Sequence, residues 1–102
     1  MSTSQTTKRT LEEAVQYHQS GDLEKAEALY TKVLELDPQQ ADALNLLGVI
    51  AHQAGNLDRA LAWFDQAMAA APKLATIPFN KANALKDSGR TKDARAAYEA
   101  AL

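Results

Sequence analysis

The feature that most constrains this chain is an internal repeat with a period of 34 residues. A glycine, an alanine and an aromatic ring recur at this spacing: Gly21, Gly55 and Gly89; Ala26, Ala60 and Ala94; and Tyr30, Phe64 and Tyr98. When residues 7–40 are aligned with residues 41–74, eight of the 34 positions are identical and no gap is needed. Such self-similarity is typical of units that stack on copies of themselves. We therefore expect one repeat domain over residues 7–102, whose third unit, 75–102, is incomplete.

Each unit has the sequence pattern of two helices. Ala and Leu, which lead the ranking of helix propensity, make up a third of the chain. The recurrent glycine marks a turn, and Asp22 or Asn56 follows it as a residue able to cap the second helix. Pro38 and Pro72 come where that second helix should end, because the residue before a proline resists helical geometry. The first helices are predicted over about 10–20, 41–54 and 75–88.

The start of the first helix is predicted from Thr10 and Glu13, which have the spacing of a capping box. Residues 1–6 then form a flexible N-terminal tail. Thr10 and Glu13 also stand where apolar residues would be expected, so they give this helix a more polar outward face. Terminal repeats with such faces act as caps of a solenoid.

The repeat resembles the tetratricopeptide repeat, whose pattern is W-x2-L-G-x2-Y, then A-x3-F, then P. The residues of the second unit that carry the resemblance are Leu44, Leu47, Gly48, Ala51, Ala60, Phe64 and Pro72. The resemblance implies an all-α fold, a right-handed superhelix of three antiparallel helix pairs with about six helices. Small residues at positions 14, 48 and 82 would let paired helices approach closely, and the aromatic ring would fill the gap between neighbouring units.

Composition excludes several classes of function. There is no cysteine, and the net charge is −2 with no basic stripe, so thiolate chemistry and nucleic-acid binding are not expected. No apolar run is long enough to span a membrane, and no secretory signal is present, so we expect a cytoplasmic protein. His18 and His52 lack the spacing of a metal site, and no nucleophile or phosphate-binding motif occurs. The sequence predicts no enzyme, no metal and no cofactor.

The resemblance also implies which residues line a concave peptide groove, because the first helix of each pair faces it. The candidate groove residues are Leu11, Val15, His18, Asn45, Leu46, Val49, His52, Phe79, Asn80, Asn83 and Lys86. Their amides offer a donor and an acceptor to a peptide backbone, or are simply solvated. Their apolar members suit a hydrophobic anchor, or pack between helices.

Two subfamilies give different expectations for this groove. One binds the acidic tail of a chaperone through lysine, arginine and asparagine, but the corresponding positions here hold Leu11, Val15, Leu46, Thr76 and Asn80, so this role is not expected. The other is attached to protein O-glycosyltransferases and holds an extended substrate through a ladder of asparagines. Only Asn80 occupies the ladder position in this chain.

The sequence therefore predicts a non-catalytic module that binds a protein or peptide in its groove. The chain stops inside the last predicted helix, at residues 98–102, which leaves two alternatives open. It is the N-terminal substrate-recruiting arm of a larger glycosyltransferase, sulfotransferase or methyltransferase, or it self-associates through its uncapped C-terminal end.

Overall fold

The structure, a computed structural model, describes the backbone of residues 3–101 and all side chains in that range except those of residues 91 and 92. This part of the chain forms six α-helices and no strand. The helices are α1 (Thr3–Gln19), α2 (Leu23–Leu36), α3 (Ala41–Gln53), α4 (Leu57–Ala70), α5 (Thr76–Asp87) and α6 (Thr91–Ala101). The predicted all-α fold of three helix pairs is confirmed.

One turn joins the two helices of each pair, and its geometry explains the recurrent glycine. Gly21 has a φ of +87°, in the left-handed region that side chains disfavour. Its N–H donates to the carbonyl of His18 at 3.1 Å, and the N–H of Asp22 donates to the carbonyl of Tyr17 at 2.9 Å. These two bonds close the helix end as a Schellman motif, and the other two turns repeat them.

The residue after the glycine then begins the next helix. The side chain of Asp22 accepts a bond from the N–H of Lys25, and that of Asn56 accepts one from Arg59. Both predicted N-caps are confirmed. The second helices end at Leu36 and Ala70, just before the prolines that were predicted to stop them.

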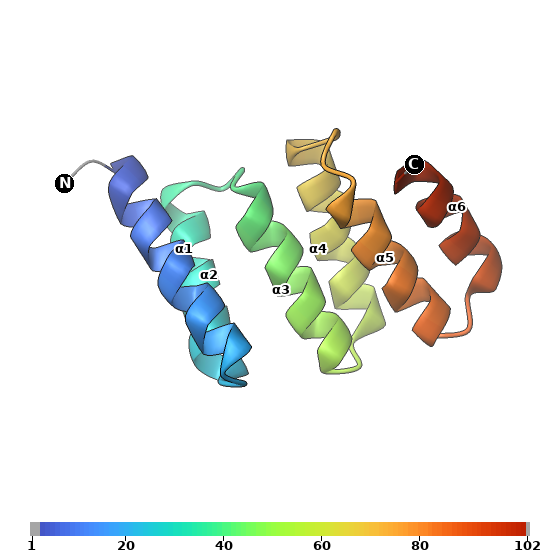
Figure 1. Cartoon of the computed structure of the whole chain (residues 1–102), viewed down its shortest axis with the longest axis horizontal. Helices are drawn as coiled ribbons and strands as arrows, with labels where there is room; N and C mark the ends of the chain where they lie inside the picture. Colours follow the sequence, from blue (N-terminus) through green and yellow to red (C-terminus); the bar gives the residue numbers. More distant parts are fainter. Residues whose placement is uncertain (1–2, 102) are drawn as a thin grey trace.

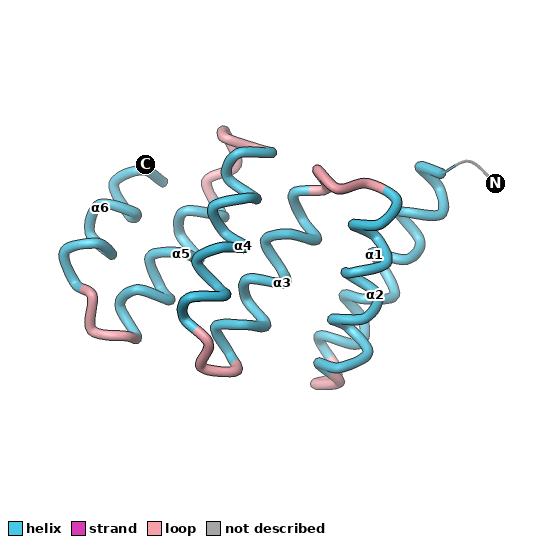
Figure 2. The backbone as a smooth tube through the Cα atoms, turned by 180° about the vertical axis from the view of Figure 1, so that it is seen from behind, coloured by secondary structure: helices cyan, strands magenta, loops and turns pink. Residues whose placement is uncertain are grey.

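The pairs stack side by side along the long axis of the molecule (Figure 1). Within each pair the two helices pack closely, and the pairs are joined through α2 against α3 and α4 against α5. Helices α1, α3 and α5 lie together on one side, and α4 runs across the opposite side when the molecule is turned (Figure 2). We call the exposed side of α1, α3 and α5 the groove face.

The core lies between successive helices, where the sequence places its small and aromatic residues. Tyr30 and Phe64 are both 0% exposed, each in a cluster that includes residues of the next pair. A Cβ added at Gly48 would lie 2.5 Å from the ring of Phe64, so α3 and α4 depend on a residue without a side chain at this contact. Trp63 is partly buried and packs against both clusters, in the seam between the first two pairs.

The start of α1 differs from the prediction. The helix begins at Thr3 rather than Thr10, so residues 3–6 are helical and the predicted tail is wrong for them; residues 1 and 2 lie outside the described range. Thr7 and Thr10 are 7% and 8% exposed, because they lie one turn apart on the face that packs against its neighbour. Thr10 therefore lies inside α1 and is buried against the neighbouring helix. Contrary to the prediction from the sequence, it is neither the N-cap of the helix nor part of an outward polar face.

Candidate functional site

A series of polar contacts connects the first helices of successive pairs on the groove face. His18 Nε2 lies 3.1 Å from Gln53 Oε1, and His52 Nε2 lies 2.7 Å from Asp87 Oδ2. Each contact joins residues 35 positions apart, one more than the repeat period. We call these two contacts the histidine ladder, since they join α1 to α3 and α3 to α5.

His18 also contacts the core. Its Nδ1 lies 3.3 Å from the hydroxyl of Tyr30, and the two rings meet edge to face at 6.1 Å. Since Gln53 Oε1 can only accept, His18 donates from Nε2, and its Nδ1 is within hydrogen-bond distance of the Tyr30 hydroxyl. Burial raises the pKa of Tyr30 to about 12, because the phenolate would lose its water. The first histidine therefore satisfies the hydroxyl of a fully buried tyrosine, which the second histidine cannot do because Phe64 stands at that position.

An amide pair occupies the middle of the groove face. Asn80 Nδ2 donates to Asn45 Oδ1 at 3.1 Å, again across 35 positions. Asn45 is 5% exposed and Asn80 is only partly buried. Asn45 therefore fixes the rotation of the Asn80 amide, whose carbonyl oxygen stays free of this bond. The third candidate amide, Asn83, accepts a 2.7 Å bond from the hydroxyl of Tyr98.

The apolar candidates differ in how far they are exposed. Leu11, Val15 and Leu46 are partly buried and pack against the core cluster between the first two pairs. Val49 packs against the cluster of the next junction. Phe79 is different, because half of its surface (50%) is exposed. It is the candidate that offers an apolar surface to another molecule.

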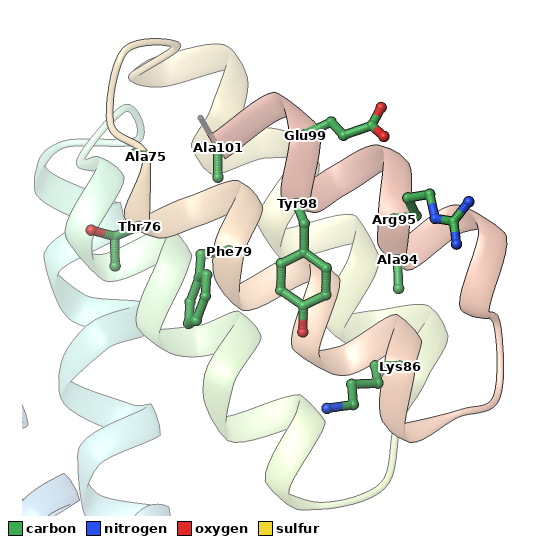
Figure 3. A pocket seen from close by; sticks show the side chains of 9 residues that line it. All are labelled: Ala75, Thr76, Phe79, Lys86, Ala94, Arg95, Tyr98, Glu99 and Ala101. Atoms are coloured by element: carbon green, nitrogen blue, oxygen red, sulfur yellow. The ribbon is translucent and has the colours of Figure 1, made fainter.

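The C-terminal end of the stack carries an open hollow of about 840 Å³ between α5 and α6. Phe79 and Tyr98 stand side by side at its centre, with ring centroids 5.7 Å apart and planes at 62° (Figure 3). Lys86 lies at its lower edge, and Arg95 and Glu99 project from α6 on the side away from α5 (Figure 3). We call this surface the C-terminal face.

The structure places all eleven sequence-predicted residues on α1, α3 and α5, and it joins some of them directly. Asn45 bonds Asn80, while His18, His52 and Asn83 bond residues outside the candidate set. Lys86 is exposed and lies at the C-terminal face. Tyr98 is the residue at this end that the groove prediction omitted. Its repeat position assigned it to the core, but no helix after α6 covers it within the part of the chain that the structure describes.

Within residues 3–101 there is no group of three or more side chains suited to hold a metal ion. No helix in that range combines the length and the apolar character that crossing a membrane requires.

The three stacked helix pairs and their groove face define a helical-repeat protein. The family to which it belongs follows from sequence comparison. The pattern of the tetratricopeptide repeat matches residues 11–75, and a second pattern of the same description matches residues 77–102. The chain belongs to the tetratricopeptide repeat family. No curated protein sequence matches it.

Solved structures show the same fold. A mutant of the O-GlcNAc transferase of Thermobaculum terrenum matches with a TM-score of 0.94 and 29% identity, over 100% of this chain and 20% of that chain. The type III secretion translocator chaperone SycD of Yersinia enterocolitica matches with a TM-score of 0.90 and 23% identity, over 96% of this chain and 73% of that chain.

A third structure, described as the first tetratricopeptide repeat domain of Spaghetti (RPAP3) bound to an HSP90 peptide, matches with a TM-score of 0.89 and 18% identity, over 96% of this chain and 78% of that chain. The predicted resemblance to the repeats of O-glycosyltransferases is thus confirmed for the fold. The chain spans only a fifth of the length of the transferase it matches.

Proposed function

We propose that this protein is a non-catalytic interaction module of the cytoplasm that holds an extended peptide segment on its groove face. The observation that carries the proposal is the fixed amide of Asn80 beside the half-exposed ring of Phe79. An oriented amide can bond a peptide backbone, and a neighbouring ring can bury one apolar side chain. SycD in complex with a peptide of the translocator YopD has the same fold, which supports the proposal.

The chemistry of the groove argues against an acidic chaperone tail as the ligand. Leu11 and Val15 stand where a cationic clamp would need charged or amide side chains, and both pack against the core. The groove candidates include one cation, Lys86, at the C-terminal edge. We therefore expect the ligand to be recognised through its backbone and one apolar side chain rather than through carboxylates.

A displayed library of random dodecapeptides tests the proposal. We expect the protein to enrich extended peptides with an apolar residue, and Asn80→Ala to weaken their binding by about tenfold, since one hydrogen bond to an amide is lost. Phe79→Ser should remove most of the remaining binding, while Leu36→Ser, an exposed apolar residue outside the face, should not. Enriched peptides that still bind the Phe79→Ser, Asn80→Ala double variant, with its thermal melt unchanged, would contradict the proposal.

A second candidate is the substrate-recruiting arm of a larger enzyme. This candidate is favoured by the similarity to a region within an O-GlcNAc transferase. It is also favoured by Asn80, which occupies a position of the asparagine ladder found in the repeats of O-glycosyltransferases. The reading frame after the codon of Leu102 decides between the two. A glycosyltransferase, sulfotransferase or methyltransferase domain encoded in frame would support the arm, and an immediate stop codon would contradict it.

A further inference from the structure

The C-terminal face has the character of a surface that another helix covers. At the two internal junctions the aromatic residue of the second helix is fully buried, because Tyr30 is covered by α3 and Phe64 by α5. Tyr98 is the equivalent residue of α6 and remains partly exposed beside the half-exposed Phe79. Paired apolar rings around an open hollow of about 840 Å³ favour association.

The charges at the edge of this face are arranged for self-recognition. Arg95 and Glu99 are four residues apart on α6, both exposed, and both point away from α5 (Figure 3). When two copies of a helix pack antiparallel about a two-fold axis near residue 97, residue 95 of one copy lies opposite residue 99 of the other. Each Arg95 then faces a Glu99, twice in the same interface.

The opposite end of the molecule is unsuited to cover the same face. The α3 residues that cover Tyr30 are Ala43, Leu47 and Ile50, all buried. One repeat earlier, the equivalent residues of α1 are Arg9, Glu13 and Gln16, all exposed and polar. Head-to-tail stacking would therefore place polar side chains on the two rings.

We propose that the C-terminal face binds a second copy of this chain, tail to tail, through antiparallel contact of the two α6 helices. Tyr98 and Phe79 of the two copies fill the paired hollows, and the reciprocal Arg95–Glu99 pairs fix the direction. The contact closes as a dimer because the same surface is used by both copies. The groove face of α1 and α3 stays accessible in this dimer, but Phe79 belongs to both surfaces, so a bound peptide and the second copy would compete for its ring.

Sedimentation equilibrium of the 102-residue chain, from micromolar to millimolar concentration, tests the dimer. We expect the wild type to show a monomer–dimer equilibrium, and Arg95→Glu or Glu99→Arg alone to weaken it by about tenfold, because each puts like charges opposite each other twice. An equimolar mixture of the two variants should recover dimerisation as a heterodimer, since every pair is then of opposite sign. Circular dichroism verifies that both variants stay folded.

The outcomes separate the possible occupants of the face. A wild type that stays monomeric at millimolar concentration overturns the proposal, and the face is then left to a following helix or another protein. Dimerisation that neither variant weakens overturns the two-fold arrangement, as does a mixture that associates no better than its components. Loss of dimerisation with unchanged peptide binding by the groove face would leave the proposed function intact.

Discussion

Tyr30 and Tyr98 stand at the same position of their repeats, yet they differ in burial and in the residues they contact. Tyr30 is 0% exposed, bonds His18 and packs among residues of α3. Tyr98 is partly exposed, bonds Asn83 and contacts the ring of Phe79. Both belong to a helix that packs on its own partner in the same way. The difference therefore comes from the next pair, which buries the first tyrosine, whereas no helix within residues 3–101 covers the second in this way.

This comparison shows that a repeat position specifies a contact with a neighbour rather than burial by itself. A solenoid is stabilised by terms within each unit and by terms between adjacent units. Tyr30 contributes to both kinds of term, whereas Tyr98, among the described residues, contributes to the first kind. Substitutions at the two positions measure how large the second kind is.

The largest effect is expected from truncating the two tyrosines. Tyr30→Ala leaves a cavity in a fully buried junction and should lower the free energy of unfolding by about 3–5 kcal/mol, a large fraction of the stability of a domain this size. Tyr98→Ala should cost roughly 1–2 kcal/mol, because its side chain is partly exposed and less apolar surface is lost from the interior. Urea denaturation of both variants measures the difference. Equal costs would show that the covering helix α3 adds nothing to the burial of Tyr30.

The second effect is a loss of stability in alkali that depends on Tyr30. Its pKa is about 12 in the folded protein and 10.0 in an unfolded chain, so below pH 10 its contribution is fully present. As the pH rises from 10 to 12 the unfolded chain loses its proton first, and the free energy of unfolding falls by up to roughly 3 kcal/mol. Tyr30→Phe should remove this part of the alkaline loss, as seen by subtracting its denaturation curves from those of the wild type.

The matched control for this pH dependence is Tyr98→Phe, in which the Tyr30 phenol is unchanged. We expect this variant to retain the difference that Tyr30→Phe removes. If both variants lost stability in alkali as the wild type does, the burial of the Tyr30 hydroxyl would not be the cause.

A smaller effect is expected at the contact between α3 and α4. Gly48→Ala should lower the free energy of unfolding by about 1–3 kcal/mol, because the new methyl group would lie 2.5 Å from the buried ring of Phe64. The equivalent positions of the other pairs already hold Ala14 and Ala82, each 0% exposed beside a tyrosine in the partner helix. A thermal melt of Gly48→Ala equal to or above that of the wild type would show that Phe64 can move aside.

Much of the fold was predictable because the repeat places the same physical requirement at the same position three times. The turn at Gly21 and the caps at Asp22 and Asn56 are local features, so the sequence alone predicts them. The start of α1 is different. Its first turns contain Thr, Ser and Gln without an apolar pattern, and only burial of Thr7 and Thr10 against the rest of the fold reveals that they are helical.

The candidate site was predictable as a set of helix positions but not as a set of contacts. The period of 34 residues places His18 and His52 on the same face, yet each contacts a residue 35 positions away. The offset of one position depends on the axial shift between adjacent first helices. A sequence period does not specify this shift. Whether Asn45 and Phe79 are covered or exposed depends on the same packing.

The smallest effect tests whether the histidine ladder adds to the coupling between pairs. The positions of His18 and His52 are continued in the third pair by Lys86, which contacts no following pair in the described range 3–101. Both ladder contacts are at least partly exposed, so double-mutant cycles of His18 with Gln53 and of His52 with Asp87 should each give a coupling below about 1 kcal/mol. Lys86→Ala should change the free energy of unfolding by less than either histidine variant. A cost at Lys86 as large as at His18 would mean that this position stabilises its own helix rather than the junction, and the contrast between covered and uncovered repeats would then rest on the aromatic residues alone.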